Sequence, residues 1–228
     1  MRRVAVMVVI AAALAARAEA QEYLDRGTLV IARGGSETGR VEFAVRATSG
    51  QGQGGLLVVG TTRTPAHEVQ YILEVTRELT PVTYQLSETT GGHVVRRVSA
   101  QVVGMRFSAR ASTEAGDVAR ELPVRPPFVI MGSDDFTFYF FLPRPEPGAS
   151  RVVNVVRTEN LTLTTGTVTN LADDTVLIAG HPIDCRKYEL KLADGDTRQF
   201  CMTPTGGLVQ VVIASSGITA TLSQPPSR

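Results

Sequence analysis

Hydrophobic and polar residues alternate along most of the chain, which is the pattern of β-strands with one buried face and one solvent-facing side. Val41, Phe43 and Val45 alternate with polar or small residues, and residues 69–75 repeat the pattern. Further alternating segments occupy residues 82–86, 98–102, 105–111, 161–163, 188–192, 209–213 and 218–222. We therefore predict a mainly β protein built from many short strands.

Turn-forming residues separate these segments. They are Gly34-Gly35, the glycine-rich loop 50–55, Gly91-Gly92, Asp173-Asp174, Asp194-Gly195, Gly206-Gly207 and Ser215 to Gly217. Short strands joined by tight turns form an antiparallel meander. Strands of a parallel sheet covered on both faces would instead be continuously apolar, so a doubly wound nucleotide-binding fold is excluded.

Prolines interrupt the meander in its middle and bound an insertion at about residues 123–150. The insertion holds the densest aromatic stretch of the chain, namely Phe136, Phe138, Tyr139, Phe140 and Phe141. Ser133 as a cap, Asp134 and Asp135 in the first turn and Pro143 as a stop favour a short helix here, although the β-rich composition also suits a strand. Such a group of rings forms either a buried plug or a binding surface for an apolar ligand.

The N-terminus has the features of a secretory signal peptide. Arg2 and Arg3 precede an apolar run that is too short to span a bilayer, and Ala18-Glu19-Ala20 is a small-x-small cleavage site. We expect cleavage after Ala20, export to the periplasm or the extracellular space, and no transmembrane span in the mature chain. Residues 21–228 are then expected to form a single antiparallel β domain.

Charge narrows the range of partners. The 228-residue chain has 23 Lys plus Arg against 22 Asp plus Glu. Nucleic-acid binders usually carry an excess of positive charge, so we expect no nucleic-acid partner. The remaining candidates are a lipid or another protein of the cell envelope.

Cys185 and Cys201 are the two cysteines of the chain, and in an exported protein they predict a disulfide. The bridge closes a loop of about 16 residues, which is worth about 3 kcal/mol by loop entropy. A two-residue turn at Asp194-Gly195 would put the two sulfurs on different faces of the hairpin. We therefore predict either a three-residue loop, with Gly195 as a bulge residue, or strands that diverge beyond Arg186.

Catalytic and metal-binding motifs are missing from the sequence. His67, His93 and His181 are far apart and lack metal-ligand spacing, so we expect no metal and no cofactor. Asp134 and Asp135 are adjacent, point in different directions, and are interpreted as turn carboxylates. Asp184 and Cys185 lie near His181, but a disulfide-bonded cysteine cannot act as a nucleophile.

The layout resembles that of the lipoprotein-carrier (LolA/LolB-like) half-barrel proteins. The features that carry the resemblance are the signal peptide, the meander, the middle segment with Ser133-Asp134-Asp135-Phe136, and a closing series from Tyr188-Glu189-Leu190 to Thr203 through Val209. The resemblance implies a curved antiparallel sheet, a half-barrel or barrel of about eleven strands, wrapped round a short helix or plug segment. It also implies an apolar inner face that accepts acyl chains.

Three functions follow from the sequence. We expect a non-enzymatic exported protein that binds a lipid or acyl chain, with Phe136, Phe138, Tyr139, Phe140 and Phe141 lining the cavity. One alternative is a structural or protein-interaction module of the bacterial cell envelope without a ligand. The other is a secreted hydrolase with a site near His181 and Asp184.

Overall fold

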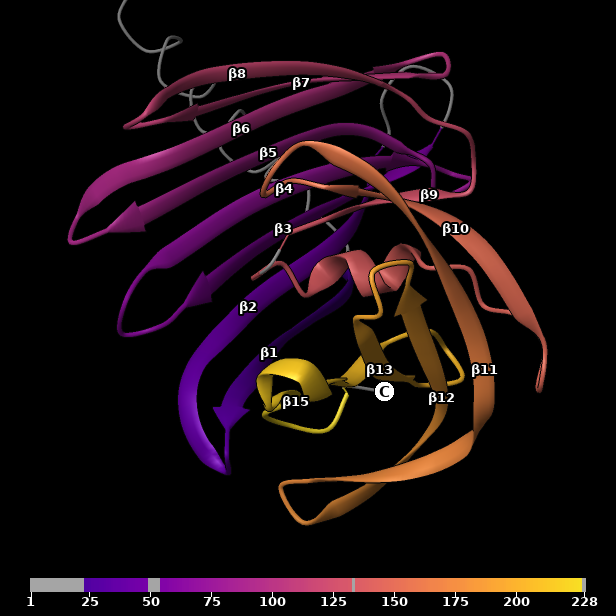
Figure 1. The fold of residues 1–228 in the computed structure, drawn as a ribbon. Helices are drawn as coiled ribbons and strands as arrows, with labels where there is room; N and C mark the ends of the chain where they lie inside the picture. Colours follow the sequence, from indigo (N-terminus) through magenta and orange to yellow (C-terminus); the bar gives the residue numbers. More distant parts are fainter. Residues whose placement is uncertain (1–22, 49–53, 133, 227–228) are drawn as a thin grey trace, which may run out of the picture.

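The structure is a computed structural model that describes residues 23–48, 54–132 and 134–226. All the strands in these ranges belong to one curved sheet of 15 strands, which does not close into a barrel (Figure 1). The prediction of a mainly β protein with a curved antiparallel sheet is therefore confirmed. The predicted signal peptide, Ser133 and residues 49–53 of the glycine-rich loop lie outside the described residues.

The chain first forms eight strands in order. They are β1 (Tyr23–Arg33), β2 (Ser36–Thr48), β3 (Gly55–Arg63), β4 (Glu68–Thr76), β5 (Pro81–Thr90), β6 (His93–Val103), β7 (Arg106–Thr113) and β8 (Gly116–Pro123). The second half contains β9 (Phe128–Met131), the 3-10 helix η1 (Thr137–Phe141), β10 (Ser150–Arg157), β11 (Thr162–Ile178), β12 (His181–Leu192), β13 (Thr197–Met202), β14 (Leu208–Ile213), the 3-10 helix η2 (Ala214–Ser216) and β15 (Ile218–Leu222).

Two antiparallel meanders share this sheet. The first runs from β1 outward to β8 at one edge, and the chain then crosses to β9 at the opposite edge. From β9, which pairs in parallel with β10, the second meander returns until β15 pairs with β1. The insertion between the two blocks thus carries the chain from one edge of the sheet to the other.

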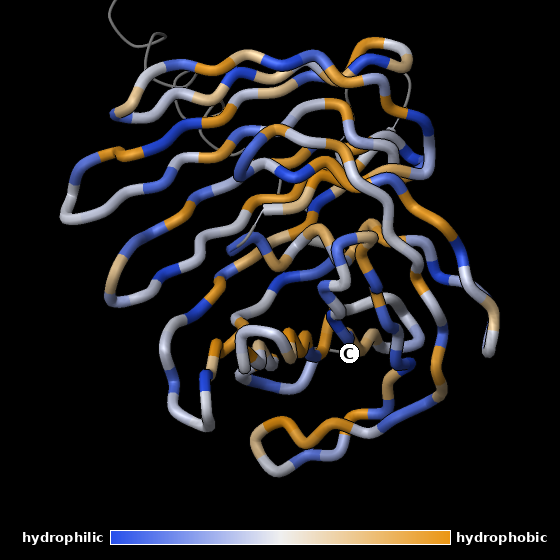
Figure 2. Tube along the Cα trace, viewed as in Figure 1, coloured by the Kyte–Doolittle hydropathy of each residue, from blue (hydrophilic) through white to orange (hydrophobic). Residues whose placement is uncertain are grey.

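The helix η1 lies inside the curve of the sheet and connects its two halves (Figure 1). The ring of Phe140 contacts that of Phe43 on β2, with centroids 5.3 Å apart, and the ring of Tyr139 contacts that of Phe200 on β13 at 5.2 Å. Along the strands the hydropathy alternates between apolar and polar positions (Figure 2). The apolar side chains of both halves form the main core around this plug.

The insertion and one turn differ from the sequence-based expectation. The helix is a short 3-10 turn that begins at Thr137 with Phe136 as its N-cap residue, and Ser133, the predicted cap, lies outside the described residues. The turn predicted at Asp173-Asp174 is wrong, because β11 continues through both residues to Ile178. Their carboxylates bind Arg186 and Lys187 on β12, which lets two adjacent aspartates remain in a strand.

The predicted disulfide between Cys185 and Cys201 is confirmed, with the Cα atoms 5.6 Å apart. Lys187 pairs with Cys201 in the register of β12 and β13, so the two cysteines are diagonal neighbours. Of the two predicted alternatives, the structure has the three-residue loop, with Gly195 at a positive φ of 92°. The bridge belongs to a smaller apolar cluster with Val176, Ile178 and Val209.

Candidate functional site

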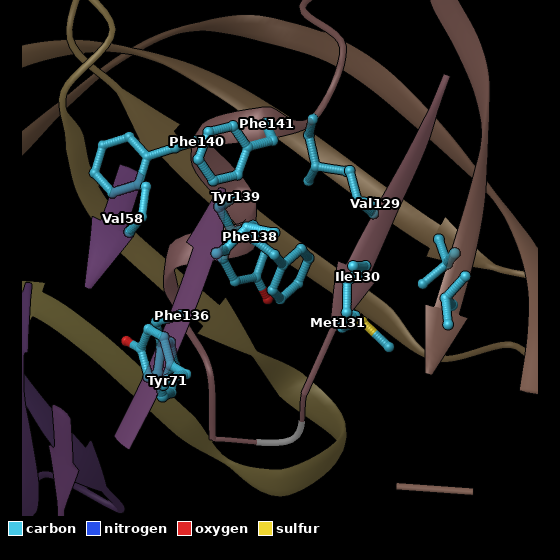
Figure 3. Close-up of a cluster of buried hydrophobic side chains, with 14 of the residues drawn as sticks. Val58, Tyr71, Val129, Ile130, Met131, Phe136, Phe138, Tyr139, Phe140 and Phe141 are labelled. Atoms are coloured by element: carbon cyan, nitrogen blue, oxygen red, sulfur yellow. The ribbon is translucent and has the colours of Figure 1, made fainter. Parts of the chain in front are cut away.

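The aromatic residues predicted to line a ligand cavity are deeply buried (Figure 3). Phe136, Phe138, Tyr139 and Phe140 pack in the main core with exposures of 0–7%. Phe141 is also buried, but it lines a surface hollow at the end of the plug. Of the five predicted residues, the structure thus brings Phe141 to a hollow, and a direct ligand contact by the other four stays a prediction.

This hollow, the plug-end cleft, has a volume of about 530 Å³. Apolar side chains supply most of its lining: Leu79, Pro126, Pro127, Phe128, Phe141, Leu142 and Pro143. They come from the β4–β5 turn, from the segment that leads into β9 with its first residue, and from the end of η1 with the two residues after it. A mostly apolar hollow of this volume is within the usual range of small-molecule sites.

Leu79 reaches the cleft from a strained backbone position. Its φ is 61°, which is rare for a bulky side chain. Thr76 holds the turn, because its carbonyl accepts a hydrogen bond from the Leu79 amide at 3.0 Å and its hydroxyl accepts one from the Glu78 amide at 3.2 Å. The turn thereby packs Leu79 against the main core instead of pointing it into solvent. Such strain is typical of ligand-binding positions.

Two arginines, Arg144 and Arg151, and one acid, Glu78, stand at the rim of the cleft, so its formal charge is positive. Neither Arg144 nor Arg151 has a carboxylate partner within 4.0 Å among the described residues. Arg144 donates hydrogen bonds to the carbonyls of Phe140 at 3.3 Å and Gly206 at 3.5 Å, and desolvation lowers its pKa. An apolar cleft with unpaired guanidinium groups at its rim can hold an apolar body and an anionic group together.

A buried polar group, the Asp135 cluster, holds the start of the plug. It consists of Thr62, Tyr71, Tyr84, Asp135, Thr137 and Thr158. Asp135 Oδ1 accepts hydrogen bonds from the backbone amide of Thr137 at 2.8 Å and from its hydroxyl at 2.7 Å. The hydroxyl of Thr62 donates to the carbonyl of Asp134 at 2.5 Å. The bond from Thr62 ties the segment before η1 to β3, and the bonds between Asp135 and Thr137 fix the start of η1 locally.

Several oxygen atoms of this cluster are buried without a hydrogen-bond partner. They are Asp135 Oδ2, Tyr71 Oη, Tyr84 Oη and Thr158 Oγ1. A β-carbon built at Gly132 would lie 3.4 Å from Tyr84 Oη and 3.3 Å from Thr158 Oγ1, so these groups meet around Gly132. Buried polar atoms in this state are commonly bridged by internal water.

Burial governs the protonation of Asp135. Desolvation raises its pKa from 3.8 to about 6, although the hydrogen bonds from Thr137 act in the opposite direction. Burial and the nearby Asp135 carboxylate also raise the pKa values of Tyr71 and Tyr84 well above 10. None of the ion pairs in the described ranges includes Asp135, so its charge is neutralised only by protonation, below about pH 6.

The sequence interpretation of Asp134 and Asp135 as turn carboxylates is incomplete. Asp135 is 2% exposed, whereas the side chain of Asp134 is partly exposed and its Oδ2 lies 3.1 Å from Nε2 of His67. The contact between His67 and Asp134 also went unpredicted, because these residues are 67 positions apart. In the sequence, this segment is marked by Gly132, two aspartates and an aromatic run, but that pattern does not predict that the Asp135 side chain is buried.

The alternative site near His181 and Asp184 does not assemble into a catalytic group. Both residues lie on β12 three positions apart, so their side chains extend from opposite faces of the strand. Cys185 is bonded to Cys201 and has no thiol to offer. Within the described ranges, no three or more His, Cys, Asp or Glu residues are grouped as metal ligands would be. No helix described by the structure is both long and apolar enough to traverse a membrane.

Comparison with known proteins adds one distant likeness. No family model matches the chain, and no curated protein matches it. Among solved structures, it is similar to a DUF1089 family protein from Pseudomonas aeruginosa, with 10% sequence identity and a TM-score of 0.42, over 80% of this chain and 88% of that chain. A likeness at this level carries no argument about function, and the resemblance to lipoprotein carriers stays a prediction.

Proposed function

We propose that this protein is a non-enzymatic, exported binding protein for an amphipathic ligand with an acyl-like body and an anionic headgroup. The acyl body lies in the plug-end cleft against Leu79, Phe128 and Phe141, and the headgroup meets Arg144 and Arg151. The observation that carries the proposal is the combination of an apolar cleft with two unpaired arginines at its rim. The disulfide supports an oxidising compartment outside the cytoplasm.

The cleft differs from the half-barrel cavity that the sequence resemblance implies. The plug fills the inside of the curved sheet, because Phe138 and Tyr139 are fully buried there. The ligand therefore contacts the end of the plug, at Phe141 and Leu142, and the remaining aromatic residues support this wall from behind. The aromatic segment serves binding mainly as the rigid base of the cleft.

Titration calorimetry with saturated fatty acids tests the proposal. Burial of one methylene is worth about 0.8 kcal/mol, so affinity should rise about fourfold for each carbon added between octanoate and dodecanoate. Dodecanol should bind about tenfold more weakly than dodecanoate, because it lacks the charge that pairs with the arginines.

The matched variants are the double substitution Arg144→Gln with Arg151→Gln and the control Arg120→Gln. Arg120 is exposed on the edge strand β8 and does not line the cleft. The double variant should lose the preference for dodecanoate over dodecanol, whereas the control should keep it. Absence of binding at every chain length would reject the proposal and favour a protein-interaction module of the cell envelope.

A further inference from the structure

The outer face of the first meander carries a second hollow, unrelated to the plug-end cleft. It has a volume of about 900 Å³ and lies on β2 to β7, where side chains such as Glu42 and Ala44 project from the face opposite the Phe43 ring, which contacts Phe140 of η1. We name it the transverse trough, because it crosses the strands instead of following them. Its lining shares no residue with that of the plug-end cleft.

The register of the sheet builds the trough from two rows of side chains. One row crosses six strands through directly paired residues, Ala44, Val59, Ile72, Gln85, Ser99 and Arg110. The second row, two residues away along each strand, is Glu42, Thr61, Gln70, Ser87, Arg97 and Ser112. Side chains two residues apart on a strand share a face, so both rows project outward and the backbone between them forms the floor.

The chemistry of the rows suits a polar ligand with negative charge. Hydroxyl and amide side chains occupy the middle strands, and two guanidinium groups stand at the β6–β7 end. Arg110 pairs with Asp117, and Glu42 pairs with Arg63 at 2.9 Å. Arg97 has no carboxylate partner among the described residues, so its positive charge is available to a ligand at the β6–β7 end, whereas Arg63 is shared between Glu42 and Glu68 near the β2–β4 end.

The spacing of the rows selects among polar ligands. Neighbouring strands are about 4.8 Å apart, so each row presents one side chain at this interval. The second row is polar throughout, and the first row is polar from Gln85 to Arg110. This interval is close to the length of one pyranose unit in an extended glycan. A peptide would gain main-chain hydrogen bonds at a sheet edge but none while lying across the strands. Of the 12 side chains in the two rows, Ala44, Val59 and Ile72 are the apolar ones, so an acyl chain would meet mostly polar side chains.

We propose that the transverse trough binds an extended acidic oligosaccharide, whose hydroxyl groups contact Gln70, Gln85 and Ser99 and whose carboxylates pair with Arg97 and Arg110. The apolar side chains at the β2–β4 end offer a surface for the C–H face of a sugar ring. This inference does not depend on a ligand in the plug-end cleft.

Surface plasmon resonance with a short oligogalacturonate tests the proposal, with a neutral maltooligosaccharide and polyglutamate as comparison ligands. We expect binding of oligogalacturonate, with weaker binding of both comparison ligands. The double substitution Arg97→Gln with Arg110→Gln should reduce the affinity about tenfold or more, because two charge-assisted contacts are lost. Gln85→Leu should weaken binding without changing its salt dependence.

The control is Arg106→Gln, on the same strand as Arg110 but outside the lining of the trough. It should leave the affinity unchanged. Equal loss in this control, or polyglutamate binding as tight as that of oligogalacturonate, would show a diffuse charge effect and overturn the proposal. Lack of oligogalacturonate binding by the wild-type protein would also overturn it.

Discussion

The ring of Tyr71 lies directly across Gly60, its partner on the neighbouring strand. A β-carbon built at Gly60 would come within 2.2 Å of the ring atoms, and the two residues face each other in the register of β3 and β4. The absence of a side chain at this position lets the ring lie flat over β3 and brings its hydroxyl to the Asp135 cluster. Gly60 therefore shapes the buried polar cluster without contributing any polar group.

Gly60→Ala should destabilise the protein by about 1–3 kcal/mol, because the added methyl group forces the ring of Tyr71 out of its place. Urea unfolding measures the change. The control is Gly54→Ala, where the nearest atom to the new methyl group is the Thr48 carbonyl oxygen at 3.8 Å, an ordinary contact. Equal stability of Gly60→Ala and wild type would refute the close approach of the ring.

Asp135→Asn should stabilise the protein above pH 6 and leave it unchanged below pH 3.8. The pKa of Asp135 is raised in the folded state to about 6. The neutral side chain therefore contributes its full stability below pH 3.8, and this stability is lost as the pH rises through 6 and the buried carboxyl ionises. The buried charge then costs about 3 kcal/mol, which asparagine avoids while Oδ1 still accepts the bonds from Thr137.

Urea unfolding of wild type and variant at pH 3.5 and pH 8 measures this difference. Asp184→Asn serves as the control, because Asp184 is exposed on β12. If Asp135→Asn is less stable than wild type at pH 8, a nearby positive charge stabilises the ionised carboxylate of Asp135.

Phe138→Ala should cost about 3–5 kcal/mol of stability, since the ring is fully buried in the plug. Dodecanoate affinity, measured by calorimetry where the variant is folded, should stay unchanged, because Phe138 does not line the plug-end cleft. A folded variant with much weaker affinity would instead place this ring in contact with the ligand, as the sequence-based prediction has it.

Removing both cysteines by Cys185→Ser with Cys201→Ser should cost about 3 kcal/mol, because the bridge closes a loop with a sequence separation of 16. Thermal unfolding compares the double variant with the wild type, oxidised and reduced. The reduced wild type should unfold near the double variant. A melting temperature unaffected by reduction would show that the bridge adds little to the folded state.

Much of the sheet was predictable because apolar and polar residues alternate along a strand that has one buried face. This signal identified the segments of β2, β4 and β5, and the position of Gly195 gave the register of the disulfide hairpin. Several strands matched none of the predicted segments, and β8 and β9 illustrate two different reasons. In β8, at the sheet edge, most residues are exposed, whereas all four residues of β9 are buried.

The sites depend on contacts between distant residues, which no local pattern encodes. The plug-end cleft combines Leu79 with Phe128 and Phe141, from segments that only the sheet topology brings together. The burial of Asp135 arises because β9 crosses over the inner side of β5, where Tyr84 faces Gly132. The sequence predicted that the aromatic segment is important, but not that most of its rings support the cleft from within the core.

Native mass spectrometry of the protein purified from a bacterial periplasm tests the central claim, the binding of an amphipathic anionic ligand, most directly. We expect a co-purifying adduct of lipid mass on the wild-type protein. This adduct should be lost on organic extraction and strongly reduced in the double variant Arg144→Gln with Arg151→Gln. A wild-type protein that carries no adduct and gains none when incubated with dodecanoate would rule out the proposed ligand.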